Sequence, residues 1–163
     1  MAIPNGYSRR QIALHWIVFV LVVLQFVLHE GISDAWDVVE DGGSVAFSPV
    51  VAGHVIGGLL VLLLVIWRLQ IRATRGAPPP PKEENPALKH VAKAVHAGLY
   101  LLLILMPLSG AVAWFGGVEP AAEAHEVMRL GILALVGLHI AGALYHQFIL
   151  RNNLMNRMRQ AAD

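Results

Sequence analysis

Long apolar stretches alternate with shorter polar segments along this chain. Four stretches, at about 11–29, 50–67, 94–116 and 127–150, are nearly free of charged residues. A helix needs roughly 20 mostly apolar residues to cross about 30 Å of hydrocarbon. The pattern therefore predicts an all-α integral membrane protein with four transmembrane helices.

The connections between these stretches favour an antiparallel four-helix bundle. The proline run Pro78–Pro81 and the following Lys82–Asn85 predict an extended, solvated link between the second and third helices, because proline lacks a backbone donor. No repeat of fixed period extends beyond two helical hairpins. Residues 1–163 are therefore expected to form a single four-helix domain.

Composition supports the membrane interpretation and narrows the possible chemistry. Hydrophobic residues make up 56% of the chain and charged residues only 14%, which is abnormal for a soluble domain. The net charge of +1 gives no sign of a nucleic-acid partner. Without cysteine the chain has no disulfide, iron–sulfur cluster or thiolate zinc site, so metal chemistry falls to nitrogen and oxygen ligands.

Basic residues are strongly segregated along the chain. Eleven of the 12 lie before the first stretch, between the second and third, or after the fourth: Arg9, Arg10, Arg68, Arg72, Arg75, Lys82, Lys89, Lys93, Arg151, Arg157 and Arg159. The positive-inside rule then places both termini and the 68–93 loop in the cytoplasm. The 30–49 and 117–125 loops are expected to face outward.

Histidines are the main functional clue, because ionisable residues at membrane depth are costly and usually face the bundle interior. Six of the 8 lie in or beside the predicted helices: His15, His54, His96, His125, His139 and His146. Any one of them alone could be a structural hydrogen-bonding group. Together they favour b-type haem, an apolar disc held by two neutral imidazoles from different helices.

Helical geometry predicts two haem levels. His125 and His139 are 14 residues apart, which leaves them about 40° apart in azimuth and roughly 21 Å apart along the helix. Ligands that far apart cannot serve one tetrahedral zinc site. By topology His54 shares the outer level with His125, and His15 shares the inner level with His139.

The inner level leaves alternatives open. Counted from Arg151, His139 lies roughly 18 Å from the inner end, whereas His15 lies only about 8 Å inside Arg10. His146 matches the depth of His15 better, and His96 also lies near the inner end. His96 and His146 are therefore second-choice ligands, or groups that hydrogen-bond a haem propionate or a quinone.

Four segments resemble the bacterial cytochrome b561 family, and through it the cytochrome b subunits of membrane hydrogenases and formate dehydrogenases. These segments are YSRRQIALHW, GHVIGGLLVLLLVIWRL, HAGLYLLLILMPLSG, and HE with GLHIAGALYHQFILRNNLMNRM. The resemblance implies a four-helix inner-membrane protein with two haem b. The family's ligand positions fall on His15, His54, His125 and His139.

The same resemblance implies electron transfer between a quinone, here ubiquinone, and another donor or acceptor. One small branch of the family is a superoxide:ubiquinone oxidoreductase, similar to this chain in size and layout. The outer loops do not suit that activity, because they are acidic and would repel an anion such as superoxide. Their acidic residues are Glu30, Asp34, Asp37, Glu40, Asp41, Glu119 and Glu123. Such a surface suits a cationic periplasmic electron-transfer protein, or is simply a solvated loop.

Further polar residues have candidate roles around the haems. Arg129 lies one turn beyond His125, where it could bind haem propionates or pair with Glu126 instead. An inner mouth for quinone is predicted near Tyr7, Ser8, Arg9, Lys93 and His96.

Two other functions remain open at this stage. The chain could be a non-catalytic cytochrome b anchor that docks a larger redox subunit on one face. A small histidine-lined membrane transporter is the alternative from another class, and it predicts acidic companions within the helices. Only Glu126, near a helix end, supplies one.

Overall fold

The computed structural model describes residues 4–81 and 85–162, and within these ranges it contains helices and no strand. The long helices are α1 (Arg9–Val27), α3 (Pro49–Arg75), α4 (Pro86–Gly116) and α5 (Glu119–Leu144), with a shorter α2 (His29–Glu40). A π-helical turn (Tyr145–Ile149) extends α5, and a 3-10 turn (Leu154–Met158) follows it. The predicted all-α fold class is confirmed.

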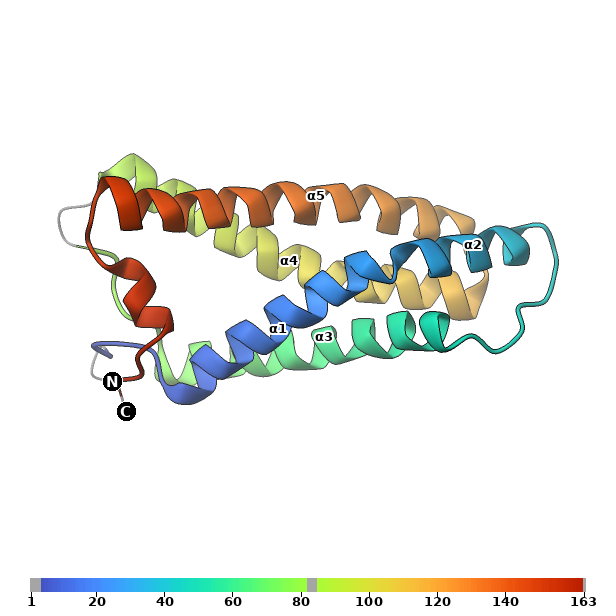
Figure 1. The fold of residues 1–163 in the computed structure, drawn as a ribbon, viewed down its shortest axis with the longest axis horizontal. Coiled ribbons are helices and arrows are strands. Elements are labelled where there is room, and N and C mark those ends of the chain that lie inside the picture. Colours follow the sequence, from blue (N-terminus) through green and yellow to red (C-terminus); the bar gives the residue numbers. More distant parts are fainter. Residues whose placement is uncertain (1–3, 82–84, 163) are drawn as a thin grey trace.

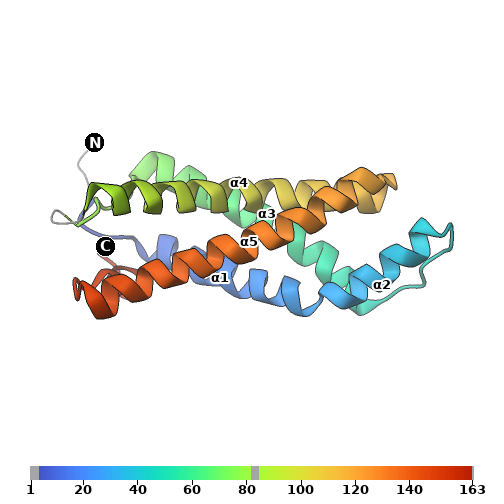
Figure 2. The same ribbon diagram turned by 90° about the horizontal axis from the view of Figure 1, so that it is seen from above.

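Four of these helices, α1, α3, α4 and α5 with its π-helical turn, are long and apolar enough to cross a membrane. They run antiparallel in sequence order, so that the two chain ends lie at the same end of the bundle (Figure 1). Helix α5 packs mainly on α4, while α3 packs on both α1 and α4. Figure 2 shows α5 crossing over α1 when the bundle is viewed from above.

The tightest packing lies between α1, α3 and α4. Val18, Val61 and Val65 are buried there against partly buried neighbours that include Tyr100 and Ile104. Many large apolar side chains point outward instead, among them Val20, Ile56, Leu101 and Leu133. An apolar outer surface of this kind is what contact with lipid requires.

Helix starts follow local sequence signals. Ser8 caps α1 in a capping box: its hydroxyl accepts from the Gln11 backbone amide, and its own backbone amide donates to the Gln11 side chain. Ser48 and Asn85 cap α3 and α4, each followed directly by a proline at the first helical position. Residues 76–81, which include the four prolines of the predicted link, have no regular structure. Lys82, Glu83 and Glu84 of that link lie outside the described residues.

Helix α2 is a feature that the sequence analysis missed, since its residues were assigned to an outward-facing loop. Its apolar side chains, Ile32, Ala35, Trp36 and Val39, have the spacing of one helix face. Ala35 is buried, and α2 contacts α3 more extensively than α1. The helix therefore lies against the end of the bundle opposite the chain termini and is not an open loop (Figure 1). This end is here called the outer end, and the end with the termini the inner end.

Three of the four long helices, α3, α4 and α5, are also longer than the apolar stretches that predicted them. Helix α3 has 27 residues and α4 has 31, whereas about 20 suffice to span the hydrocarbon. After α5 the chain folds back towards α1. The indole nitrogen of Trp16 donates to the Met158 carbonyl at 2.9 Å, and the Ala162 amide donates to the Tyr7 carbonyl at 3.0 Å.

Candidate functional site

His54 of α3 and His125 of α5 face each other in the outer half of the bundle. Their ring centres are 6.4 Å apart, with 60° between the ring planes. Nδ1 of His125 lies 2.8 Å from the Met106 carbonyl. Because a carbonyl oxygen only accepts, this contact places the proton on Nδ1 and leaves Nε2 free to bind a metal.

Gly110 makes the position of the His125 ring possible. A methyl group at residue 110 would lie 2.9 Å from Cε1 and 3.0 Å from Nδ1 of His125. The ring can therefore approach α4 closely enough to reach the Met106 carbonyl. The Ser109 hydroxyl also donates to this carbonyl, at 2.8 Å, and lies 3.3 Å from Nδ1 of His125.

Three histidines meet in the inner half of the bundle. The ring centres of His15 and His139 are 6.0 Å apart, and those of His96 and His139 are 5.0 Å apart. Nδ1 of His96 donates to the Ala92 carbonyl at 2.6 Å. His15 and His139 are half-buried, whereas His96 is exposed. The structure thus brings His15 and His139 together despite their unequal distances from the flanking arginines.

The spacing of these rings can be compared with that of a bis-imidazole metal site. Two imidazoles bonded at about 2 Å to opposite sides of one metal ion have their ring centres about 6 Å apart. The separations of 6.4 Å and 6.0 Å match this value, whereas 5.0 Å is shorter. Within residues 4–81 and 85–162 no three His, Cys, Asp or Glu residues group closely enough to hold a metal on their own. The pairs therefore suit a metal whose other ligands come from a macrocycle.

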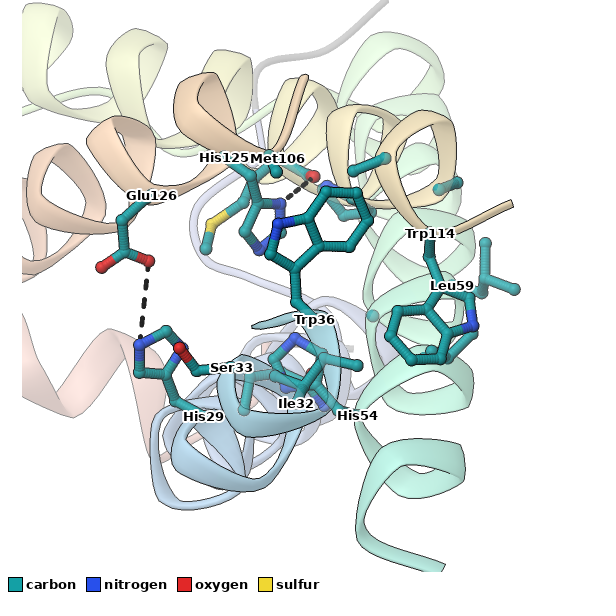
Figure 3. Close-up of a pocket in the computed structure, with 18 of the residues that line it drawn as sticks. His29, Ile32, Ser33, Trp36, His54, Leu59, Met106, Trp114, His125 and Glu126 are labelled. Carbon is teal, nitrogen blue, oxygen red and sulfur yellow. Dashed lines mark hydrogen bonds and ion pairs between the residues drawn. The ribbon is translucent and has the colours of Figure 1, made fainter. Parts of the chain in front are cut away.

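A cavity of about 340 Å³ adjoins the outer pair and includes both His54 and His125 in its lining. Figure 3 shows Trp36 of α2 pointing into it, with Leu59 and Trp114 in the wall and His29 and Glu126 at one side. Its lining is mostly apolar with a few polar groups, the usual composition of a cofactor pocket. Residues at the outer level thus fit a flat, largely apolar group.

Arg129 is paired with Glu126 in this structure. Its Nε donates to the Glu126 carboxylate at 2.7 Å, and its Nη2 contacts the same oxygen. Nε2 of His29 lies 3.7 Å from the other Glu126 oxygen. Glu126 therefore offsets the charge of Arg129, and the propionate-binding role of Arg129 stays a prediction.

The remaining predicted site residues have varied surroundings. His146 is buried in the π-helical turn, where the Asn152 side-chain amide donates to its Nδ1 at 2.8 Å. At the predicted quinone mouth, Ser8 is buried and caps α1, and the Tyr7 carbonyl accepts a bond from Ala162. These contacts show structural roles for Ser8 and Tyr7, and quinone binding at this mouth stays a prediction.

Arg68 is the main inner-site residue that the sequence analysis did not single out. Its Nε donates to the Tyr100 hydroxyl at 3.1 Å, and its Nη1 donates to the Gln11 carbonyl at 3.0 Å. The sequence feature that could have identified Arg68 is its position as a lone arginine within the apolar sequence LLLVIWRLQI. It was counted only among the basic residues that orient the chain.

A bundle of four apolar helices with facing histidines at two levels defines a membrane-bound b-type cytochrome. Comparison with known proteins agrees, because residues 6–161 match the family model for prokaryotic cytochrome b561. The chain belongs to this prokaryotic cytochrome b561 family, and membership implies haem b as the cofactor.

Curated relatives match the chain along almost its whole length. It is 36% identical over 156 residues to cytochrome b562 of Cereibacter sphaeroides, with 94% of each chain covered. It is 27% identical over 176 residues to the probable superoxide oxidase CybB of Yersinia pestis, covering 93% of this chain and 94% of the relative. Cytochrome b561 homolog 1 of Escherichia coli (strain K12) is also 27% identical, over 179 residues, covering 94% of this chain and 97% of the relative.

Proposed function

We propose that this membrane cytochrome holds two haem b and transfers single electrons between the quinone pool and a partner on its outer side. His54 and His125 would be the axial ligands of the outer haem, and His15 and His139 those of the inner haem. The observation that carries this proposal is the presence of two imidazole pairs, with ring centres 6.4 Å and 6.0 Å apart, at opposite ends of the bundle. When bound, haem iron supplies the one-electron chemistry.

The inner ligand pair is assigned by ring spacing and chain geometry. The 5.0 Å separation of His96 and His139 is shorter than that of two imidazoles on opposite sides of one metal ion, whereas the 6.0 Å separation of His15 and His139 suits this arrangement. His96 would then lie beside the inner haem as a neighbour. His146, hydrogen-bonded to Asn152, is kept as a candidate for quinone or propionate binding.

The protein's contribution is to hold the His125 imidazole in one tautomer and to exclude water. The Met106 carbonyl holds the proton on Nδ1 of His125, which fixes the ring and increases its basicity as a ligand. Helix α2 covers the outer cavity with Trp36. An apolar cover of this kind lowers the local dielectric, which is one of the ways a protein sets a haem potential.

Haem content per chain tests the assignment. We expect the detergent-purified protein to contain two haems by pyridine haemochrome and to show a b-type reduced-minus-oxidised spectrum. His54→Ala and His125→Ala should each lose one haem, and His15→Ala and His139→Ala the other. His96→Ala should keep both, as should His90→Ala, a control for the loss of an exposed histidine.

Each unexpected result of this experiment would contradict a different part of the proposal. A colourless protein that remains folded would rule out the cytochrome assignment and favour the transporter hypothesis. One haem per chain would rule out a relay through two centres. Loss of the inner haem in His96→Ala together with its retention in His15→Ala would replace His15 by His96 as the ligand.

The distribution of charged residues supports an orientation of the chain in the membrane and a class of partner. We infer that the end carrying both termini faces the cytoplasm of a bacterial inner membrane, since nearly all the basic residues lie there. Ubiquinone would exchange electrons at this end, and α2 would lie on the periplasmic side. The acidic residues of α2 and of the start of α5 are all exposed: Glu30, Asp34, Asp37, Glu40, Glu119 and Glu123.

This acidic outer face supports a cationic electron-transfer protein as the partner, because opposite charges raise the encounter rate. The second candidate is oxidation of superoxide, favoured by the relative that is named a probable superoxide oxidase. An anionic substrate would be repelled by the same face. A chain that acts only as an anchor subunit would instead copurify with a larger redox protein and show little activity alone.

Ionic strength distinguishes the two donors. With a lysine-rich c-type cytochrome, we expect the second-order rate to fall as salt is raised, because exposed charges more than about 10 Å apart are screened at 0.1 M. The triple variant Asp34→Asn, Asp37→Asn, Glu40→Gln should react more slowly at low salt and depend less on salt. A rate that rises with salt for the wild-type chain would argue against a cationic donor.

A further inference from the structure

Arg68 lies in the inner part of α3, and its side chain is directed into the bundle. An arginine near the end of a membrane helix ordinarily extends towards the lipid headgroups. Here the half-buried guanidinium instead bonds to the Tyr100 hydroxyl of α4 at 3.1 Å and to the Gln11 carbonyl of α1 at 3.0 Å. Two neighbouring helices therefore fix its position.

The charge of Arg68 lies at the level of the inner histidines. Each of its two acceptors is one helical turn from one of these rings, because Gln11 is four residues before His15 and Tyr100 is four residues after His96. Among residues 4–81 and 85–162, no Asp or Glu lies within ion-pair distance of it. Within these ranges the charge of Arg68 is therefore not offset by a carboxylate.

The outer level has the opposite electrostatic character. Arg129, the arginine within that part of α5, is bonded to Glu126, and the cavity lining there also includes Glu40, Glu119 and Glu123. Neither hydrogen-bond acceptor of Arg68 carries a negative charge. The two levels therefore differ in the sign of the charge around them.

We propose that Arg68, held by Tyr100 and Gln11, is a positioning residue that raises the reduction potential of the inner haem above that of the outer one. The inference rests on the two-haem function proposed above. Adding an electron lowers the positive charge at the iron, so a fixed nearby cation favours the reduced form, most strongly where the dielectric constant is low. The resulting difference favours electron flow from the outer side inward.

Redox titration of single-haem protein tests this role. In a His54→Ala background, which should retain only the inner haem, Arg68→Gln is expected to reduce the equilibrium constant for reduction at least tenfold. For a one-electron couple this corresponds to about 59 mV towards lower potential. Arg68→Lys keeps the charge and should shift the potential less. Arg10→Gln removes an exposed charge at the same end of the bundle and should leave it unchanged.

The outcomes separate this inference from the function on which it rests. An Arg68→Gln protein that retains the inner haem at unchanged potential would overturn the inference. If Arg68→Gln cannot hold the haem, Tyr100→Phe decides, since it removes one anchor but keeps the charge. A lowered potential in Tyr100→Phe supports the proposal, and an unchanged one overturns it. A His54→Ala protein without any haem would instead contradict the ligand assignment.

Discussion

At the scale of single residues, a ligand histidine is defined as much by its neighbours as by its own position. His125 is oriented by a carbonyl on another helix, 2.8 Å from Nδ1, and its ring packs against a residue without a side chain. No pattern within α5 specifies either contact. The carbonyl belongs to Met106, directly before Pro107 in the interior of α4.

Gly110→Ala is predicted to impair the outer haem selectively. The new methyl group would lie 2.9 Å from Cε1 of His125, and overpacking of this kind typically costs about 1–3 kcal/mol. The ring would move away from Met106, so the outer haem content should fall while the inner haem is retained. Haem content and the spectrum of the reduced protein measure the effect.

Gly142→Ala provides the matched control, because a methyl group there meets no atom within 4 Å. It should leave the outer haem intact. If Gly110→Ala binds both haems as tightly as the wild-type chain, the close approach of α4 to His125 is not needed for the outer site.

At the scale of helices, the extension of α5 past the start of α1 explains the apparent mismatch in depth at the inner site (Figure 1). Distances counted from Arg10 and Arg151 assume that α1 and α5 end at the same level. Instead the π-helical turn continues α5 as far as Ile149, and the chain then returns so that the Met158 carbonyl meets the Trp16 indole. His15 and His139 can therefore lie at one level.

Helix α2 shows how a membrane-based prediction can overlook a surface element. Its acidic residues lower the mean hydropathy, so the segment resembles a loop when only spans are sought. The apolar positions Ile32, Ala35, Trp36 and Val39 nevertheless have helical spacing. Because these positions face the bundle, α2 covers the outer cavity with Trp36, while Glu30, Asp34 and Asp37 lie outside the cavity lining and are exposed.

At the scale of the whole molecule, the segregation of charge sets the expected orientation. Cysteine labelling can test it without interference, since the chain has no cysteine of its own. We predict that Asp41→Cys reacts with a membrane-impermeant maleimide in right-side-out vesicles. Gln160→Cys should react only in inverted vesicles, because the basic end is expected to face the cytoplasm. Both residues are exposed.

Unmutated protein serves as the unlabelled control in both preparations. The reversed labelling pattern would place α2 in the cytoplasm. A periplasmic donor would then be unable to reach its acidic face, and the proposed direction of electron transfer would have to be abandoned.

Apolar length and charge distribution were enough to predict the membrane-spanning helices and the all-α class, because the thickness of hydrocarbon restricts what can cross it. The 14-residue spacing of His125 and His139 likewise predicted two levels on one helix, since the helical repeat is fixed. Both arguments are local, so a sequence suffices for them.

Only the tertiary structure determines which residues of different helices contact one another. His139 meets both His15 and His96, with ring centres 6.0 Å and 5.0 Å apart. These contacts depend on how the helices tilt, on how far α5 extends past α1, and on the C-terminal segment that returns to α1. The packing of the helices also brings Arg68 within hydrogen-bond distance of Tyr100 and Gln11. Periodicity states which face a residue occupies on its own helix, but the neighbour that this face meets depends on how the helices pack together.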